Sequence, residues 1–499
     1  MPPGTGSRGL CVPTPARIIQ LPSRRESAPV RQATGARYPG IRLTAVIGAL
    51  SRALDMAEGQ PVGHSIRTAM IGMRIASVLR LPDHERNALF YTLLLKDLGS
   101  SSNASQLASL FGADDRALKA ARRLIDWTDR RDVARYALRH ARGGWWLTRG
   151  WHALTGLRRS HTAHFEMAVT RADRGAAIAG MLAMPQQTCA AIAAVEEHWD
   201  GNGAPAGLRG DAIPLFARIT SLAQTIEVFE QAFDVRTAFD VARGRSGRWF
   251  DPALVAALDE FAADAEFWQR LSQADSLAAL RQFEHPNRVV YADELRLDTV
   301  AEAFARVIDA KSPFTARHSQ NVSFLATRTA MELGMTSREV RALRRAGLLH
   351  DIGKLGVGNT ILDKATPLTS VEFAAMQRHT EHTLEILRGV PRFARFAMLA
   401  AAHHERLDGS GYHLRLAGDQ LTMSMRVLAV VDVCEALSAA RPYRAALPVD
   451  EVLDRLDESV AAGRLCGVAV EALKSWFTGV PDHPVRLDTG GDSTSLIGI

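Results

Sequence analysis

Cysteine is scarce in this sequence of 499 residues, and its scarcity excludes two kinds of small-domain architecture. The four cysteines are widely separated and form no C-x-x-C pair: Cys11, Cys189, Cys434 and Cys466. A disulfide framework and a zinc knuckle both require closely spaced cysteines. Neither is expected, and a chain of this length can instead bury large apolar cores in two or three domains.

Long hydrophobic runs are also missing. No stretch approaches the roughly 20 apolar residues that a helix needs to cross a bilayer. The N-terminus lacks the apolar core of a signal peptide, so we expect a cytoplasmic protein without membrane contacts. Hydrophobic residues make up 47% of the chain and charged residues 23%, which is typical of a soluble globular protein.

The chain has almost no excess positive charge beyond its first 40 residues. The pI is 9.3 and the net charge is +6. Residues 1–40 contain six arginines and one glutamate, which leaves about +1 for the remainder. Because nucleic-acid-binding domains carry a basic patch on a folded surface, no nucleic-acid partner is expected. We interpret residues 1–40 as a disordered tail rich in Arg and Pro. The alternative, RNA or DNA binding by this tail, predicts an affinity that falls steeply with salt.

Strand signals are rare and helical spacing dominates. Leu43, Val46, Ile47, Leu50 and Leu54 recur at intervals of three and four residues, and the same spacing returns between 297 and 308. β-branched alternation is scarce, so the sequence predicts an all-α fold.

Two capping boxes mark the starts of helices. Thr336 with Glu339, and Thr369 with Glu372, have the three-residue spacing of this motif before apolar runs. They predict one helix that leads into His350 and another that passes through His379.

An internal repeat divides the chain. His64 matches His318 and Asp97 matches Asp351, each 254 residues later, while Asp200-Gly201-Asn202-Gly203 matches Asp408-Gly409-Ser410-Gly411 at 208. The difference between 254 and 208 places 46 extra residues in the first half, within about 100–165. The sequence predicts two tandem helical bundles, with the following parts: a tail at 1–40, a first domain at 41–265, a linker at 266–292, a second domain at 293–482 and a flexible tail at 483–499.

The second half gathers residues that bind transition metals. Imidazoles and carboxylates in apolar helical surroundings are the ligand set of such a site. The candidates are His318, His350, Asp351, His379, His403, His404 and Asp432.

Three motifs in this half resemble the HD-GYP group of the HD phosphohydrolase superfamily. They are His350-Asp351-Ile352-Gly353-Lys354, the run from His403 to His413, and Arg441-Pro442-Tyr443-Arg444. The resemblance covers about residues 293–480. His413 departs from it, because the family has proline there, and its free φ predicts a more mobile loop.

The resemblance implies a metal-dependent phosphodiesterase that hydrolyses a cyclic dinucleotide, with cyclic di-GMP as the expected substrate. Two metal ions about 3.5–4 Å apart generate the nucleophile and clamp the phosphate in such enzymes. By the family's pattern Asp351 bridges the ions and two groups of ligands complete the site: His318, His350 and Asp432 for one, and His379, His403 and His404 for the other. Iron or manganese suits this set. Phe314 stands where some members have a third-metal glutamate, so two ions are expected.

The same resemblance implies that Lys354 binds the substrate, and three further residues are candidates by their chemistry. Lys354 is expected to contact the scissile phosphate and act in catalysis, Arg441 and Arg444 to bind phosphates, and Tyr412 to stack on a base. Each has a structural alternative: a solvated lysine at a helix end, arginines paired with carboxylates, and a tyrosine that only packs.

The first half has lost most of these ligands. In the overlay Lys96 replaces His350, Arg171 replaces His379, Val195 and Glu196 replace His403 and His404, and Gln224 replaces Asp432. Cations at these positions repel a divalent metal, so no metal is expected there. This half is interpreted either as a regulatory, dimerising or ligand-sensing domain, with a homodimer as one outcome, or as a support for the second half.

Two alternatives for the whole protein stay open: a non-catalytic nucleotide receptor, and an HD phosphohydrolase acting on another nucleotide.

Overall fold

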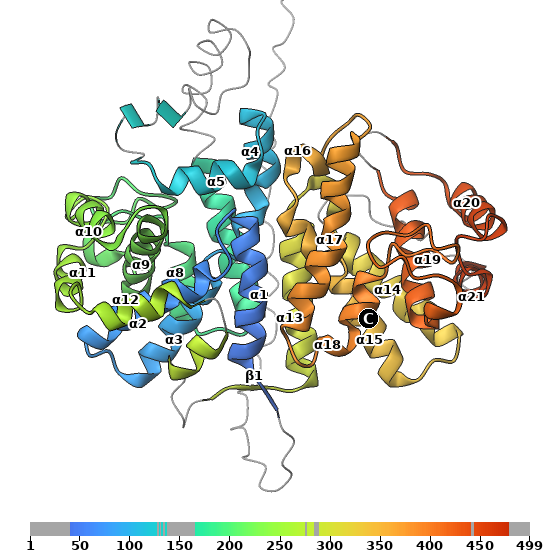
Figure 1. The fold of residues 1–499 in the computed structure, drawn as a ribbon, viewed down its shortest axis with the longest axis horizontal. Coiled ribbons are helices and arrows are strands. Elements are labelled where there is room, and N and C mark those ends of the chain that lie inside the picture. The colour runs from blue at the N-terminus through green and yellow to red at the C-terminus, as the bar shows by residue number, and fades with distance from the viewer. Residues whose placement is uncertain are drawn as a thin grey trace, which may run out of the picture. The chain divides into compact units, whose positions relative to one another are not determined.

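A computed structural model describes residues 40–126, 129, 131–132, 135–136, 165–274, 277–283, 289–440 and 444–478. Helices make up nearly all of the regular structure (Figure 1), so the prediction of an all-α fold is confirmed. The strands in the described residues are β1 (Ile41–Arg42) and β2 (Tyr291–Ala292), which pair antiparallel. Among the described residues, every helix is too short or too polar to cross a bilayer.

The helices of the first half extend from α1 to η4. Their bounds are α1 (Leu43–Ala57), α2 (His64–Val78), α3 (Asp83–Leu95), η1 (Ser100–Asn103), α4 (Ala104–Phe111), α5 (Asp115–Arg123), the helical residues 165–181, α8 (Gln186–Ala193), η2 (Gly210–Ala212), α9 (Leu215–Ala232), α10 (Val235–Gly244), α11 (Pro252–Ala257), η3 (Leu258–Glu260), α12 (Ala265–Ser272) and η4 (Leu277–Phe283).

The second half extends from α13 to α21. Its bounds are α13 (Glu294–Asp309), η6 (Pro313–Thr315), α14 (His318–Glu332), α15 (Ser337–Leu349), η7 (Ile352–Gly356), α16 (Asn359–Leu362), α17 (Ser370–Arg388), α18 (Ala394–Ala401), η8 (Gly418–Gln420), α19 (Met423–Ser438), α20 (Val449–Ala461) and α21 (Gly467–Thr478).

The helix bounds follow the internal repeat. α2 and α14 each begin at the matched histidine, and the residue before each lies in the left-handed region, with φ of 88° at Gly63 and 64° at Arg317. α8 and α9 begin 208 residues before α18 and α19 (186 to 394 and 215 to 423). The repeat in the sequence is therefore a repeat of helices.

The two halves share one hydrophobic core. α1 packs against α17 and η7 of the second half (Figure 1). Within the predicted linker, Trp268 and Leu271 of α12 and Leu280 of η4 are buried in this core, so part of that segment contributes to packing. The proposed domain boundaries stay a prediction, and both tails and the Trp-rich part of the insertion lie outside the described residues.

A buried carboxylate joins the halves. Asp115 of α5 lies 3.2 Å from the ammonium of Lys311 and 3.5 Å from that of Lys119, and it accepts a 2.9 Å hydrogen bond from the main-chain N–H of Asn359. All four residues are buried. Burial lowers the pKa of Lys311 to about 8 even beside this anion. The stability of both lysines in the interior therefore depends on Asp115.

Replacing Asp115 with alanine is expected to lower the free energy of unfolding by about 3–5 kcal/mol, because the buried ammonium of Lys311 loses its counter-charge and that of Lys119 keeps only Glu58, at 3.9 Å. Urea or thermal unfolding measures the change. Asp211→Ala is the control, since Asp211 is 88% exposed in its ion pair with Arg218 and its loss should cost under about 1 kcal/mol. Equal losses in the two variants would contradict the prediction.

Candidate metal centre

Helix ends bring the predicted ligands together. His318 is the first residue of α14, His350 and Asp351 follow the last residue of α15, and His403 follows α18 by two residues. The capping boxes that were predicted at Thr336 and Thr369 are both present and fix the starts of α15 and α17. A capping box fixes the residue at which a helix begins. It therefore also fixes the positions of His350, just after α15, and of His379, within α17.

One group of side chains surrounds the Nε2 atoms of His318 and His350, which lie 3.2 Å apart. The Oδ1 atom of Asp432, on α19, lies 3.4 Å from Nε2 of His318 and 3.6 Å from Nε2 of His350. Candidate ligand atoms of these three buried residues lie within 4.8 Å of one another. Their spacing suits a single ion held among them.

A second group consists of His379, His403 and His404. Nε2 of His379 lies 3.2 Å from Nε2 of His403, and the ring centroids of His403 and His404 are 4.1 Å apart. Ligand atoms of the three also lie within 4.8 Å of one another. The structure therefore places six of the seven candidates in the two groups expected by resemblance, and their role as ligands stays a prediction.

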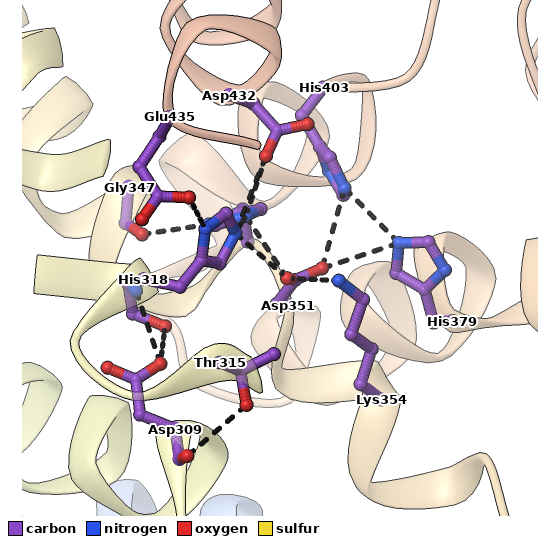
Figure 2. Close-up of polar contacts among 12 residues, drawn as sticks. Asp309, Thr315, His318, Gly347, Asp351, Lys354, His379, His403, Asp432 and Glu435 are labelled. Carbon is purple, nitrogen blue, oxygen red and sulfur yellow. Dashed lines mark hydrogen bonds and ion pairs between the residues drawn. The ribbon is translucent and has the colours of Figure 1, made fainter. Parts of the chain in front are cut away.

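Asp351 lies between the two groups. Its Oδ2 is 3.3 Å from Nε2 of both His318 and His350, whereas its Oδ1 is 3.5 Å from Nε2 of His379 and 3.6 Å from that of His403. Each carboxylate oxygen thus faces one group, which is the geometry of a bridging ligand. Lys354 donates to Oδ2 at 2.5 Å, so a cation already lies beside this carboxylate (Figure 2).

The hydrogen-bonding pattern fits metal ions. Nδ1 of His379 donates to the carbonyl of Met376 at 2.7 Å, and Nδ1 of His403 donates to that of Ala400 at 2.6 Å. A carbonyl only accepts, so in the neutral rings both Nε2 atoms carry lone pairs, and these face each other. Oδ1 of Asp351 is buried and accepts no hydrogen bond from the described residues. A cation would satisfy all three atoms.

The pKa values agree with this pattern. Burial lowers the pKa of His379 to about 4, so its imidazole is neutral, as metal binding requires. Burial also lowers the pKa of His350, but the carboxylates of Asp351 and Asp432 outweigh burial and raise it to about 9. For Asp351, burial raises the pKa, yet His350 and Lys354 hold it well below its usual range. The group formed by His318, His350 and Asp432 therefore favours positive charge.

The centre is exposed on one side. His404 and Lys354 have about a fifth of their side-chain surface exposed, at 20% and 19%, while His350, His379 and His403 are fully buried. The ring of Tyr412 lies over that of His404, with the centroids 4.5 Å apart. A substrate would approach past Lys354, His404 and Tyr412.

The remaining predicted substrate residues lie differently. The guanidinium of Arg444 donates to the carbonyls of Leu437, Ala445 and Ala436 at 2.8–2.9 Å, at the end of α19. These bonds favour a structural role for Arg444, and its phosphate contact stays a prediction. Arg441 lies outside the described residues. Nδ1 of His413 is 2.8 Å from Oγ1 of Thr380, so this loop contacts α17 beside His379.

Comparison with known proteins identifies the family. A family model described as HD domain matches residues 154–254 and 302–465, together more than half of the chain. The chain belongs to the HD-domain family. The resemblance noted in the sequence is confirmed, as is the class of metal-dependent phosphodiesterase.

Relatives of this HD-domain chain include characterised enzymes. It is 36% identical over 453 residues to the 3′3′-cGAMP-specific phosphodiesterase 3 of Vibrio cholerae, covering 91% of this chain and 98% of that protein. It is 38% identical over 151 residues to the cyclic di-GMP phosphodiesterase response regulator RpfG of Xanthomonas campestris, covering 30% of this chain and 40% of that one. A crystal structure of a cyclic GMP-AMP-specific phosphodiesterase of V. cholerae superimposes with a TM-score of 0.61 at 33% identity, covering 89% of this chain and 99% of that one.

The residues that hold the candidate ligands in place were not predicted from the sequence. Nδ1 of His318 donates to the carboxylate of Glu435, three residues after Asp432 on α19, and Asn321 donates to the other oxygen of Glu435 at 3.2 Å. Such outer contacts fix the tautomer and orientation of a metal-binding imidazole. The internal repeat held a signal for Glu435, because its counterpart Glu227 contacts His64 in the same way in the first half.

The first half has ion pairs where the second half has its candidate metal centre. Asp97 contacts the ammonium of Lys96, and the guanidinium of Arg171 lies 2.6 Å from Asp97 and 3.0 Å from Glu196. Arg123 lies 2.8 Å from Glu58 in the same network. Among the described residues, the groups of possible metal ligands all lie in the second half. Lys96 and Arg171 thus occupy the expected place of a metal with charges of their own.

Proposed function

We propose that the second half hydrolyses a cyclic dinucleotide, with 3′3′-cGAMP as the first candidate substrate. The observation that carries the proposal is the position of Asp351, with one oxygen toward each histidine group and the Nε2 atoms of His379 and His403 facing each other without a proton between them. The name of the Vibrio relative, matched over 98% of its length, supports 3′3′-cGAMP. The partial match to RpfG supports the original expectation of cyclic di-GMP.

The side chains have distinct roles in this proposal. His318, His350 and Asp432 would hold one metal ion, His379, His403 and His404 the other, and Asp351 would contact both. When bound, the ions supply an ionised water at neutral pH and positive charge against the phosphoryl oxygens. Iron and manganese both suit this donor set.

Residues at the exposed side of the centre would orient the substrate. The ammonium of Lys354 lies beside Asp351 with part of its surface exposed, where it can contact a phosphoryl oxygen. Tyr412 offers a ring face next to His404. Attack of one water breaks one phosphodiester P–O bond and leaves a phosphate on one sugar and a hydroxyl on the other. The product is the linear dinucleotide, and a second hydrolysis would give mononucleotides.

The full-length protein, purified anaerobically with iron or manganese, is expected to hydrolyse 3′3′-cGAMP at least about tenfold faster than cyclic di-GMP, and to lose turnover on chelation. Chromatography of the products and elemental analysis of the protein measure both. Faster turnover of cyclic di-GMP would reassign the substrate within the same reaction. Stoichiometric metal without turnover of either compound would favour the non-catalytic receptor.

A further inference from the structure

A row of aromatic rings leads away from the candidate metal centre on its exposed side. The ring centroid of Tyr412 lies 4.5 Å from that of His404, and the centroid of Phe373 lies 6.0 Å from that of Tyr412. Exposure rises in the same direction, because the side chain of His404 is 20% exposed whereas Phe373 is 44% exposed. Phe373 is therefore the outer end of a row that begins at a candidate metal ligand.

The start of α17 fixes the position of Phe373. Thr369 and Glu372 form the capping box of this helix, and Glu372 also accepts a 2.5 Å hydrogen bond from the ammonium of Lys364. Phe373 is the fourth residue of α17, and His379 follows six residues later on the same helix. Because both residues belong to one helix, their separation is set by helix geometry.

The segment that carries Tyr412 is attached to the same helix. The next residue, His413, contacts Oγ1 of Thr380 through its Nδ1 atom at 2.8 Å, and Thr380 directly follows His379 on α17. This contact holds Tyr412 beside the helix that carries Phe373. The two rings therefore form a surface that exists before a ligand arrives, which reduces the cost of ordering it on binding.

The rings of Phe373 and Tyr412 are nearly perpendicular, with 82° between their planes. A flat group that lies parallel to one of two perpendicular rings is perpendicular to the other. It would stack on the first ring and meet the second edge to face, and aromatic groups favour both arrangements. The pair therefore suits a flat aromatic ligand better than an aliphatic one.

Exposure of a phenylalanine is by itself common on protein surfaces. Phe324 of α14 is an example, because it is 47% exposed and its ring faces the guanidinium of Arg328. Phe373 differs in its location beside Tyr412, on the side where Lys354 and His404 are partly exposed. A substrate that reaches the centre from this side would pass Phe373.

We propose that Phe373 is a substrate-binding residue, and that one base of the cyclic dinucleotide stacks on its ring while the phosphodiester lies at the metal centre. This inference rests on the function proposed above. A phenyl ring has no hydrogen-bonding atom, so it recognises the flat face of a base and not the pattern on its edge. Phe373 should then contribute equally to the binding of 3′3′-cGAMP and cyclic di-GMP.

Steady-state kinetics of the metal-loaded full-length protein test the proposal. Phe373→Ala is expected to raise KM for both compounds by about tenfold, with kcat changed by less than about threefold, because loss of uniform binding raises KM alone. Phe373→Leu should raise KM similarly, since leucine can pack on Tyr412 but has no aromatic face. Phe373→Trp should keep KM near the wild-type value. Phe324→Ala is the matched control and should change neither constant.

Three outcomes would overturn the proposal. One is an unchanged KM in Phe373→Ala when the wild-type protein turns over either compound. Another is a wild-type KM in Phe373→Leu, which would mean that the residue only packs. The third is a smaller oligomeric mass of Phe373→Ala in light scattering, which would place the residue in an interface between copies of the chain.

Failure of the proposed function would give a different result. If the wild-type protein hydrolyses neither compound, calorimetric titration with 3′3′-cGAMP and cyclic di-GMP still tests the contact with the base. An affinity about tenfold weaker in Phe373→Ala would support the contact. Equal affinities of the variant and the wild-type protein, or no binding to either, would overturn it.

Discussion

Replacing Asp351 with asparagine is expected to reduce cyclic dinucleotide hydrolysis by about a thousandfold or more while the protein stays folded. Asparagine keeps the volume of the side chain but removes the charge that faces both histidine groups. Without it, two ions at adjacent sites would lose their shared anionic ligand. The metal content should fall in parallel with turnover, and elemental analysis beside a product assay measures both.

Asp97→Asn is the matched control, because Asp97 occupies the same place in the first half. Its carboxylate contacts Lys96 and Arg171, both buried or nearly so, and its loss should cost about 3 kcal/mol or more of stability. Activity per folded molecule should not change. A comparable loss of turnover in Asp97→Asn, or full turnover in Asp351→Asn, would contradict the assignment of Asp351 as the bridging carboxylate.

Gly353→Ala is expected to damage the same centre by a steric route. A Cβ atom at this position would lie 1.9 Å from the main-chain oxygen of His379, which is far inside contact distance. α17 would have to move away, and it carries His379. We expect a loss of about 3 kcal/mol or more in unfolding free energy. The remaining folded protein should lose about a hundredfold in turnover, because ligand misplacement of about 1 Å is that costly.

Two other glycines separate the steric effect from the chemical one. A Cβ atom at Gly99 would lie 2.0 Å from the main-chain oxygen of Arg171, the counterpart of the contact at Gly353. Gly99→Ala should lose similar stability without loss of turnover per folded molecule. Gly180 has no atom within 4 Å of an added Cβ and lies in a helix, so Gly180→Ala should lower neither quantity. Equal turnover in the Gly353 and Gly99 variants would disprove the proposed displacement of His379.

Much of this arrangement could be predicted because its signals are local or repeated. The capping boxes at Thr336 and Thr369 use side chains three residues apart, and both are present. His64 and His318 begin equivalent helices, and Asp97 and Asp351 follow equivalent helices. The insertion in the first half leaves each of these helices intact. The family resemblance then supplied which residues belong to each histidine group, and the structure brings those residues together.

What could not be predicted depends on contacts between distant segments. The repeat marks Glu435 as the counterpart of Glu227, but its contact with His318 exists only because α14 packs against α19. Asp115 and Lys311 are 196 residues apart, and nothing in either segment indicates that they meet in the interior. Arg444 was expected to bind the substrate, but its guanidinium donates to carbonyls at the end of α19. This contact depends on how the chain folds back after α19, for which the sequence has no local signal.

The ion-pair network of the first half has a consequence for how such a chain evolves after duplication. Lys96, Asp97, Arg171 and Glu196 now depend on one another for charge balance. Restoring a histidine at one position would leave a partner buried without its counter-charge and cost several kcal/mol, with no metal bound in return. A metal centre here would require several simultaneous substitutions, so single mutations acting one at a time are not expected to give this half one.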